Sequence, residues 1–401
     1  MSTPKIGLSL SGGGSRAIAF HLGCLRALHE LGVMDKVKVL STVSGGSVIG
    51  TLYAEHQGSF SDFETRVRGI LSRGLVKPSI KKILTTTEGL RAVYCWALLF
   101  IVNSFIFLVS RVTWLFSFLI PPARRHEWRV TTMGAPMRRF ASRTTILRRV
   151  FDEEVFKGKR LSDLCPKGPL LIVNAADLRT GSAFYYSPKS SGSWRFGKLA
   201  KNDVTLAQAV TASAAYPIAL PALDENLAFD KKDGSRRVER VTLTDGGVYD
   251  NLGLAPLWPD RHPEVSLNVT DIDSIICCRA GYGLRFDPPS QSFFSRFSSA
   301  FTCVHNRAQN AATKRLYDLC SSGHLQNVLV PYLGQSDCRL EFPPKDLVTR
   351  EDTHDYPTNF SAMPDEWIEK LSLRGEQLTK ALIREHWPGL LEERESFSPQ
   401  A

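Results

Sequence analysis

A serine, an aspartate and a run of three glycines each stand where a predicted strand ends. Ser44 begins the stretch Ser-Gly-Gly-Ser, Asp245 begins Asp-Gly-Gly, and the glycines occupy positions 12–14. A serine hydroxyl can attack an acyl carbon once a base takes its proton, and unpaired backbone N–H groups can hold the oxyanion that forms. These residue types are the ones that acyl transfer requires.

The glycine run lies between a strand and a helix. Residues 5–11 are predicted to form a buried strand, and the apolar spacing after residue 14 predicts a helix that ends before Gly32. Such a turn leaves N–H groups at the helix N-terminus free to bind an anion. No lysine follows the glycines, which excludes a Walker loop. Gly12, Gly14 and Ala17 fit a dinucleotide fingerprint, but the second strand ends in Ser44 and not in the acid that would bind a ribose.

Ser44 occupies the position of the nucleophile in a strand–turn–helix elbow. The strand over 36–43 leads into Ser44, and a helix is predicted after Gly46. In the pattern GxSxG a tight turn lifts the serine out of the sheet. Thr42 replaces the first glycine, which predicts crowding where the helix crosses the strand. A structural glycine turn without catalytic function is the alternative interpretation.

The candidate base is an aspartate. None of the nine histidines lies in a glycine-bounded loop after a strand, and His21 on the first helix is interpreted as structural. Asp245 follows the strand predicted over 240–244 and precedes two glycines. We expect it to face Ser44 from a neighbouring parallel strand and to act as general base, with a pKa raised by partial desolvation. A turn-forming Asp-Gly pair is the alternative.

Taken together and in this order, the motifs resemble those of the patatin-like phospholipase family. The matching segments are SGGGSR at 11–16, TVSGGS around Ser44, ASAAYP at 212–217 and DGGVYDNLG from Asp245. The resemblance covers about residues 5–280. It implies a Ser44–Asp245 dyad without histidine, metal or cofactor, acting on acyl esters of lipids. It also implies an oxyanion loop made of Gly12, Gly13, Gly14, Ser15 and Arg16.

Positive charge is concentrated in one segment of the 401-residue chain. The formal net charge is +10, and residues 66–149 contain sixteen basic and two acidic side chains. The same segment holds nineteen uncharged residues, 92–110, between Arg91 and Arg111. At helical rise this run is about 28 Å long, close to the thickness of a bilayer core.

Three interpretations of the apolar run are open: a buried core helix or cap, a full membrane span, and a segment inserted into one leaflet. A single full span would place Ser44 and Asp245 on opposite sides of the membrane. Leaflet insertion is favoured, because basic residues on both sides suit an anionic membrane surface. They are Lys77, Lys81, Lys82, Arg91, Arg111, Arg124, Arg125 and Arg129. The apolar centre makes nucleic acid a poor partner.

The predicted fold is α/β, a mostly parallel sheet flanked by helices on both faces. Further buried strands are expected over 168–176 and 272–278. A catalytic domain over 5–280 is interrupted by the insertion 66–149 and followed by a helical extension, 281–401. Eight scattered cysteines without a CxxC pair predict neither disulfides nor a zinc site. With no secretory signal apparent in the first twenty residues, a cytoplasmic, membrane-associated protein is expected.

The sequence thus predicts a serine esterase that cleaves fatty-acyl esters at a membrane surface. A membrane lipid-binding protein with a vestigial dyad is the main alternative, and a dinucleotide-dependent oxidoreductase is a third. Phospholipase, lysophospholipase, neutral-lipid lipase and acyltransferase activities are not distinguished by these residues. The acyl position and the oligomeric state are likewise left open.

Overall fold

A computed structural model describes residues 3–119, 137–217, 219–264, 266–281, 292–354 and 356–391. In these residues ten strands form one sheet in the order β10-β9-β1-β2-β3-β4-β5-β6-β7-β8. The strands are β1 Ile6–Leu10, β2 Val37–Val43, β3 Leu170–Asp177, β4 Ser182–Tyr186, β5 Gly192–Ser193, β6 Gly197–Leu199, β7 Leu223–Asp230, β8 Arg236–Asp245, β9 Ser274–Cys278 and β10 Asn327–Leu329. The helices are α1 Gly14–Glu30, α2 Gly45–Glu55, α3 Phe60–Arg73, α4 Val76–Thr85, α5 Thr87–Phe116, α7 Arg143–Val150, α8 Leu206–Ser213, α9 Gly247–Asp250, α10 Phe293–Ser321, α11 Arg350–Thr353 and α12 Asp365–His386.

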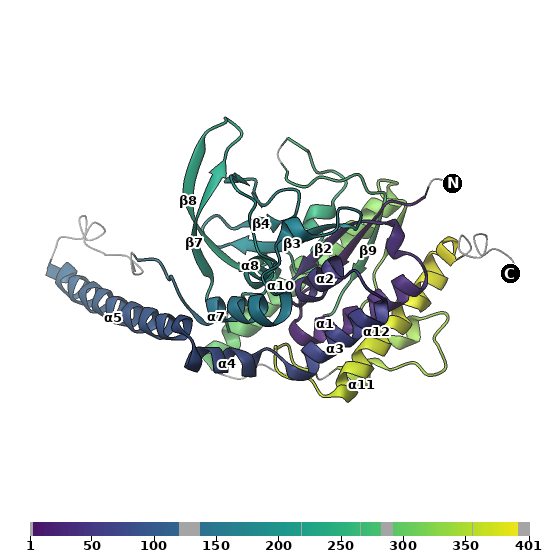
Figure 1. Cartoon of the computed structure of the whole chain (residues 1–401), viewed down its shortest axis with the longest axis horizontal. Helices are drawn as coiled ribbons and strands as arrows, with labels where there is room; N and C mark the ends of the chain where they lie inside the picture. The colour runs from purple at the N-terminus through teal and green to yellow at the C-terminus, as the bar shows by residue number, and fades with distance from the viewer. Residues whose placement is uncertain are drawn as a thin grey trace.

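The sheet has helices on both faces, which confirms the predicted fold class (Figure 1). Strands β10, β9, β1, β2 and β3 are parallel, and the pairings from β3 through β8 are antiparallel. Along β1 and β2, Leu8 and Leu40 pack into the larger core with α1, α2, α8 and α12. Val39 instead joins the smaller core with Leu316 of α10. Successive side chains of β2 therefore point into the two different cores, so both faces of this strand are buried, as expected for a central strand.

Strands β2 and β8 share one edge of β3. β4 pairs with one edge of β3, over Val173–Asp177. On the other edge β2 ends with Val43 opposite Asn174, and β8 ends with Asp245 opposite Ala175. The carboxyl ends of β2 and β8 therefore meet at adjacent positions. This corrects the expectation that Asp245 lies on a parallel neighbour of the serine strand, because β8 runs antiparallel to β3.

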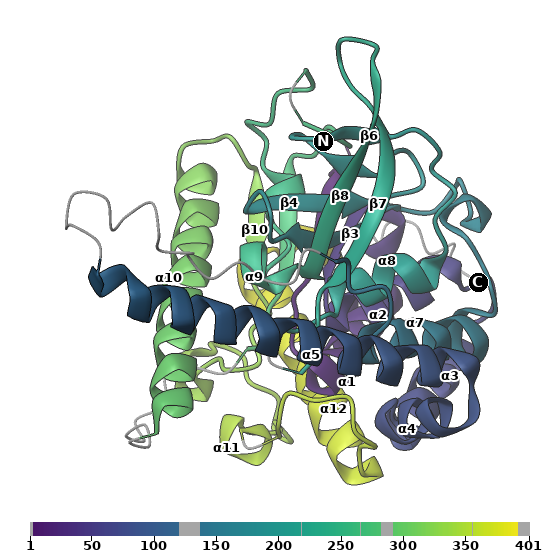
Figure 2. The same ribbon diagram turned by 90° about the vertical axis from the view of Figure 1, so that its left-hand side faces the viewer.

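The apolar run forms the exposed helix α5. Near its start Ala92, Cys95 and Leu99 are buried against a small cluster that includes Ile146 of α7. Beyond them the helix extends away from the sheet, as Figures 1 and 2 show from two sides. Only 17% of its most apolar 18-residue window is buried. The alternative of a buried core helix is therefore wrong for the part of the chain that the structure describes.

The described residues after 281 extend the sheet and the helical layer that covers it. β10 pairs with β9 at the edge of the sheet. Helix α12 lies against α1 (Figure 1). A Cβ atom on Gly23 would meet the Ser372 carbonyl oxygen at 1.7 Å, and one on Gly375 would meet the Phe20 carbonyl oxygen at 2.1 Å. Glycine is thus required on both helices for their backbones to approach so closely.

Candidate active site

Ser44 lies in a tight turn between β2 and α2. Its backbone has φ 52° and ψ −119°, a conformation that is strained for a residue with a side chain. A Cβ atom on Gly45 would meet the Gly14 carbonyl oxygen at 2.2 Å, and one on Gly46 would meet the Leu10 carbonyl oxygen at 2.3 Å. The two glycines after the serine therefore let the turn approach the glycine loop. The local geometry is that of a nucleophile elbow.

Thr42 is accommodated by a glycine on the facing helix. A Cβ atom on Gly50 of α2 would lie 2.4 Å from Thr42 Cγ2. The space that the motif usually gains from glycine at position 42 is thus provided at position 50. Thr42 Oγ1 also accepts a hydrogen bond from Ser47 Oγ at 3.1 Å and donates one to the Ile172 carbonyl at 3.2 Å. Glycine at position 50 therefore relieves the crowding that the sequence predicts at Thr42.

Asp245 is close to Ser44 and hydrogen-bonded to it. Both side chains are recessed, with Ser44 6% and Asp245 3% exposed. Burial raises the pKa of Asp245 to about 6, although hydrogen bonds from Ser44 and from the Gly247 N–H favour the carboxylate. The Gly247 N–H donates to Asp245 Oδ1 at 2.7 Å. A carboxylate with this pKa is largely ionised at neutral pH and can accept a serine proton.

The segment 212–217 joins the turns that carry Ser44 and Asp245. Ser213 Oγ accepts a hydrogen bond from the Ser44 N–H at 2.9 Å, and the Ser213 carbonyl accepts one from the Gly246 N–H at 3.2 Å. The Ala215 carbonyl accepts the Asp245 N–H at 3.1 Å. Ser47 Oγ also lies 2.8 Å from Ser213 Oγ. The role of Ser213 was not predicted, because its partners are far away in the sequence.

The glycine loop lies directly beside the elbow. A Cβ atom on Gly12 would be 3.2 Å from Ser44 Cβ, and Gly13 and Gly14 have φ of 152° and 60°. The Gly12 N–H donates to the Asn251 carbonyl at 3.0 Å. Over the described residues, the N–H groups of Gly13 and Gly14 have no protein acceptor. Gly13 caps α1 and Gly14 is its first residue, and the first turn contains no acidic residue, so the positive end of the helix dipole supports an anion there.

Ser15 and Arg16 are engaged elsewhere. The Ser15 N–H and its hydroxyl both donate to the Asn359 carbonyl, each at 2.7 Å. Arg16 is buried, and its guanidinium donates to the carbonyls of Ala280 at 3.1 Å and Tyr356 at 3.2 Å. These two residues therefore attach the loop to the C-terminal segment. Of the five residues predicted for the oxyanion site, Gly13 and Gly14 retain unpaired donors.

Asn251 is a further positioning residue that sequence reasoning missed. Its backbone carbonyl holds Gly12, and its side-chain Nδ2 donates to Gln309 of α10 at 3.3 Å. It lies within the quoted DGGVYDNLG segment, but no residue pattern indicates its contact with the glycine loop. A cavity of about 740 Å³ lies between Gly247, Asn251, Trp258 and α10, and Ser44, Asp245 and the glycine loop do not line it.

Comparison with known proteins agrees with this geometry. The sequence profile of the patatin-like phospholipases matches residues 8–258. The chain belongs to the patatin-like phospholipase family. The match contains Ser44, Asp245 and the glycine loop, and it ends before α10 and α12. No curated protein sequence matches this patatin-like chain.

Solved structures share its fold. Human GIVD cytosolic phospholipase A2 is 12% identical with a TM-score of 0.51, and the match covers 97% of this patatin-like chain and 60% of that protein. VipD from Legionella pneumophila is 15% identical with a TM-score of 0.40, over 96% of this chain and 67% of that one. At such identities the likeness to cytosolic phospholipase A2 shows a common fold.

Proposed function

We propose that the protein is a lipid acyl hydrolase in which Ser44 is the nucleophile and Asp245 the general base. The observation that carries the proposal is the meeting of β2 and β8 on one edge of β3, which brings a strained serine against a buried carboxylate. Family membership supports an acyl ester of a lipid as the substrate class.

In the proposed reaction, the Asp245 carboxylate accepts the Ser44 Oγ proton as Oγ attacks the acyl carbonyl carbon. The N–H groups of Gly13 and Gly14 hold the tetrahedral oxyanion, and one such donor is worth about 3–4 kcal/mol of barrier. The intermediate collapses to acyl-Ser44, and the departing alcohol takes the proton from Asp245. A water molecule, deprotonated by Asp245, then attacks the acyl group. As the bond from the acyl carbon to Ser44 Oγ breaks, Oγ takes that proton back from Asp245 and the fatty acid is released.

We also propose that α5 inserts into a membrane from one side. Its exposed apolar side chains include the successive positions Phe107, Leu108 and Val109, so they surround more of the helix than a single stripe. The start of α5 packs against the domain that contains the sheet. The chain contacts this domain again at Arg139, whose N–H donates to Asp224 at 3.0 Å. Both ends of the inserted segment therefore stay with the body, as leaflet insertion requires and a single span does not allow.

Basic residues near α5 support attraction to anionic lipids. Lys77 and Lys81 of α4 are exposed, and Arg111 lies over the Phe107 ring at 4.9 Å. Lys82 is paired with Glu153 and is less available. Arg124, Arg125 and Arg129 of the predicted set lie outside the described residues. Each basic residue near such a surface adds about 1 kcal/mol.

The test is fatty-acid release from vesicles of phosphatidylcholine and an anionic phospholipid by the purified chain. We expect Ser44→Ala and Asp245→Asn to lower the rate at least about 1000-fold, as removal of members of serine catalytic groups does. Ser187→Ala is the matched control, since Ser187 is a buried serine whose hydroxyl has no hydrogen-bond partner. Equal release by wild type and Ser44→Ala would disprove the assignment.

Labelling by an alkyl fluorophosphonate separates a missing dyad from a wrong substrate. An activated serine displaces fluoride from phosphorus and becomes covalently modified. Modification at Ser44 without fatty-acid release from these vesicles indicates that another acyl ester is the substrate. Absence of both supports the alternative of a lipid-binding protein with a vestigial dyad.

A further inference from the structure

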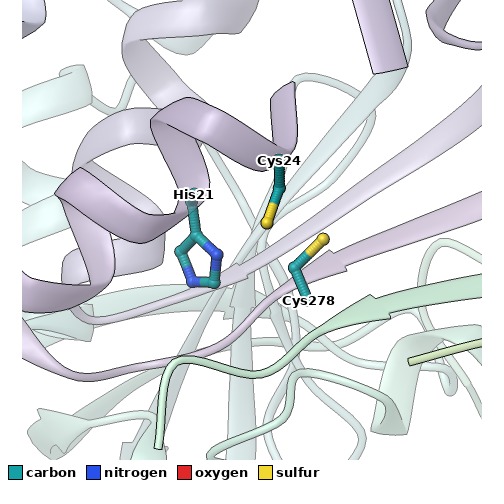
Figure 3. A group of neighbouring side chains, drawn as sticks. All are labelled: His21, Cys24 and Cys278. Carbon is teal, nitrogen blue, oxygen red and sulfur yellow. The ribbon is translucent and has the colours of Figure 1, made fainter. Parts of the chain in front are cut away.

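Three metal-ligating side chains meet behind the glycine loop (Figure 3). They are His21 and Cys24 of α1 and Cys278 at the end of β9. One ligand atom from each, an imidazole nitrogen or a sulfur, lies within 4.8 Å of the others. All three residues are 0% exposed. The cluster takes no part in the proposed hydrolysis.

The histidine is oriented as a metal ligand would be. Its Nε2 lies 3.0 Å from the Ser11 carbonyl, so Nε2 carries the proton and donates it there. Nδ1 is then an unprotonated, buried acceptor that, among the described residues, has no hydrogen bond of ordinary geometry and lies close to Cys24 Sγ. Figure 3 shows the imidazole ring beside the two cysteines. Metal-binding histidines commonly donate their second nitrogen to a backbone carbonyl in this way.

We propose that His21 Nδ1, Cys24 Sγ and Cys278 Sγ are three ligands of a thiophilic divalent cation, Zn²⁺. Two thiolates neutralise the charge of Zn²⁺, which suits a fully buried position. Zinc–sulfur distances are about 2.3 Å and zinc–nitrogen distances about 2.0–2.1 Å, so bound ligand atoms lie about 3.5–3.8 Å apart. The observed group needs to contract by about 1 Å.

The site would join two elements, α1 and β9, beside the glycine loop. His21 and Cys24 are three residues apart and lie on one face of α1. The Cys278 carbonyl accepts the Ser11 N–H at 3.1 Å, next to the first glycine of the loop. Without a metal, the Cys24 thiol donates to the Gly375 carbonyl of α12 at 3.6 Å, a hydrogen bond that a metal-bound thiolate would give up. A cation here would therefore hold β9 and α1 in place behind Gly12.

Metal content of the reduced, purified full chain tests the site. After expression with added zinc, we expect about one zinc per chain in wild type and less than about a tenth in Cys24→Ser/Cys278→Ser. Cys277→Ser is the matched control and should keep its zinc. Cys277 is the adjacent buried cysteine, but it packs in the core on the other face of the sheet. Its sulfur accepts a hydrogen bond from the Ser9 hydroxyl at 3.5 Å.

Cobalt substitution identifies the ligands directly. Co²⁺ added to the reduced zinc-free wild type should give thiolate-to-cobalt charge-transfer absorption, reduced about twofold in either single cysteine variant and lost in the double variant. The exposed Cys165, Cys303 and Cys338 are present in every variant and cannot account for such a loss. If the double variant does not fold, the zinc content and the cobalt spectrum of the wild type alone show whether the site binds a metal through its thiolates.

Three results would overturn the proposal. One is a wild type that contains no zinc and gives no thiolate band with Co²⁺. Another is a band that persists undiminished in the folded double variant. The third is a disulfide between Cys24 and Cys278, seen as two thiols that react with an alkylating agent only after reduction of the denatured chain.

Discussion

At the scale of single residues, the dyad combines two unfavourable states. Ser44 has a backbone conformation that side chains rarely adopt, and Asp245 is a carboxylate almost without solvent. Hydrogen bonds from the surrounding chain are needed to hold both residues in these states. Ser213 bonds to the Ser44 N–H, and the Gly247 N–H bonds to Asp245. Both conditions cost stability and prepare the groups for reaction.

The pKa of Asp245 predicts opposite effects of pH on rate and stability. The folded chain keeps this proton up to about pH 6, whereas the unfolded chain loses it near the ordinary aspartate pKa of 3.8. Between these values the folded state binds more protons, so its stability falls as pH rises. At one pKa unit per about 1.4 kcal/mol, the cost above pH 6 is about 3 kcal/mol.

Asp245→Asn should therefore be more stable than wild type at about pH 7.5, by up to about 3 kcal/mol, with the difference disappearing near pH 4. Urea unfolding at both pH values measures this. The wild-type hydrolysis rate should instead decrease as pH falls through about 6, because the base becomes protonated. A stability difference that does not change with pH would contradict the assigned pKa.

Ser213→Ala should lower kcat about 10- to 100-fold with little change in KM. The substitution leaves the buried Ser44 N–H without its acceptor, a loss of about 1–3 kcal/mol. Because Ser213 acts through Ser44, labelling by fluorophosphonate should slow in parallel. Unchanged kcat with a lower melting temperature would show that Ser213 is only structural.

At the scale of elements, the crossing of α2 over β2 depends on a pair of residues. Gly50 provides the space that Thr42 occupies, and the serine turn lies between them in the sequence. A sequence pattern that requires glycine at position 42 misses this exchange. The elbow is thus defined by the space between helix and strand and not by one position.

Gly50→Ala should destabilise the protein by about 1–3 kcal/mol through overpacking against Thr42 Cγ2. Thr42→Ala in the same chain removes that methyl group and should restore part of the loss. Thermal unfolding of both variants measures the rescue. Gly69→Ala in α3 is the control, since a Cβ atom there meets nothing within 4 Å. Absence of rescue would place the strain elsewhere.

At the scale of the whole molecule, α5 carries its exposed apolar surface away from the sheet that holds Ser44 and Asp245. The helix is held by the body at its start and is exposed along most of its length (Figure 2). Of thirty residues, it is about 45 Å long at helical rise. A surface of this size can anchor the protein while the sheet that carries the dyad stays intact.

Replacing Ile101, Phe105 and Leu108 by aspartate should lower binding to anionic vesicles at least about tenfold without unfolding the protein. All three side chains are more than 60% exposed, so their substitution removes membrane contact and not core packing. Co-sedimentation with vesicles measures the binding of each variant. Aspartates at the exposed Val238, Tyr317 and Phe342 form the control set. Equal binding by both triple variants would exclude α5 as the anchor.

The sequence by itself determined the elements that carry chemistry. Hydrophobic runs ended by glycines predicted β1, β2 and the turns at Gly12, Ser44 and Asp245 to within a few residues, because these signals are local. The α/β class was confirmed for the same reason. The sequence also indicated α5 through its uninterrupted apolar run, though not whether the helix is covered.

Only the tertiary structure decided how the parts meet. The antiparallel approach of β8 to β3, the bridge made by Ser213 and the burial of Arg16 all depend on partners more than 60 residues away. The same holds for His21, Cys24 and Cys278, whose spacing fits no local metal motif. Sequence patterns report a residue's own neighbourhood, whereas these contacts are made when distant strands pair and helices pack.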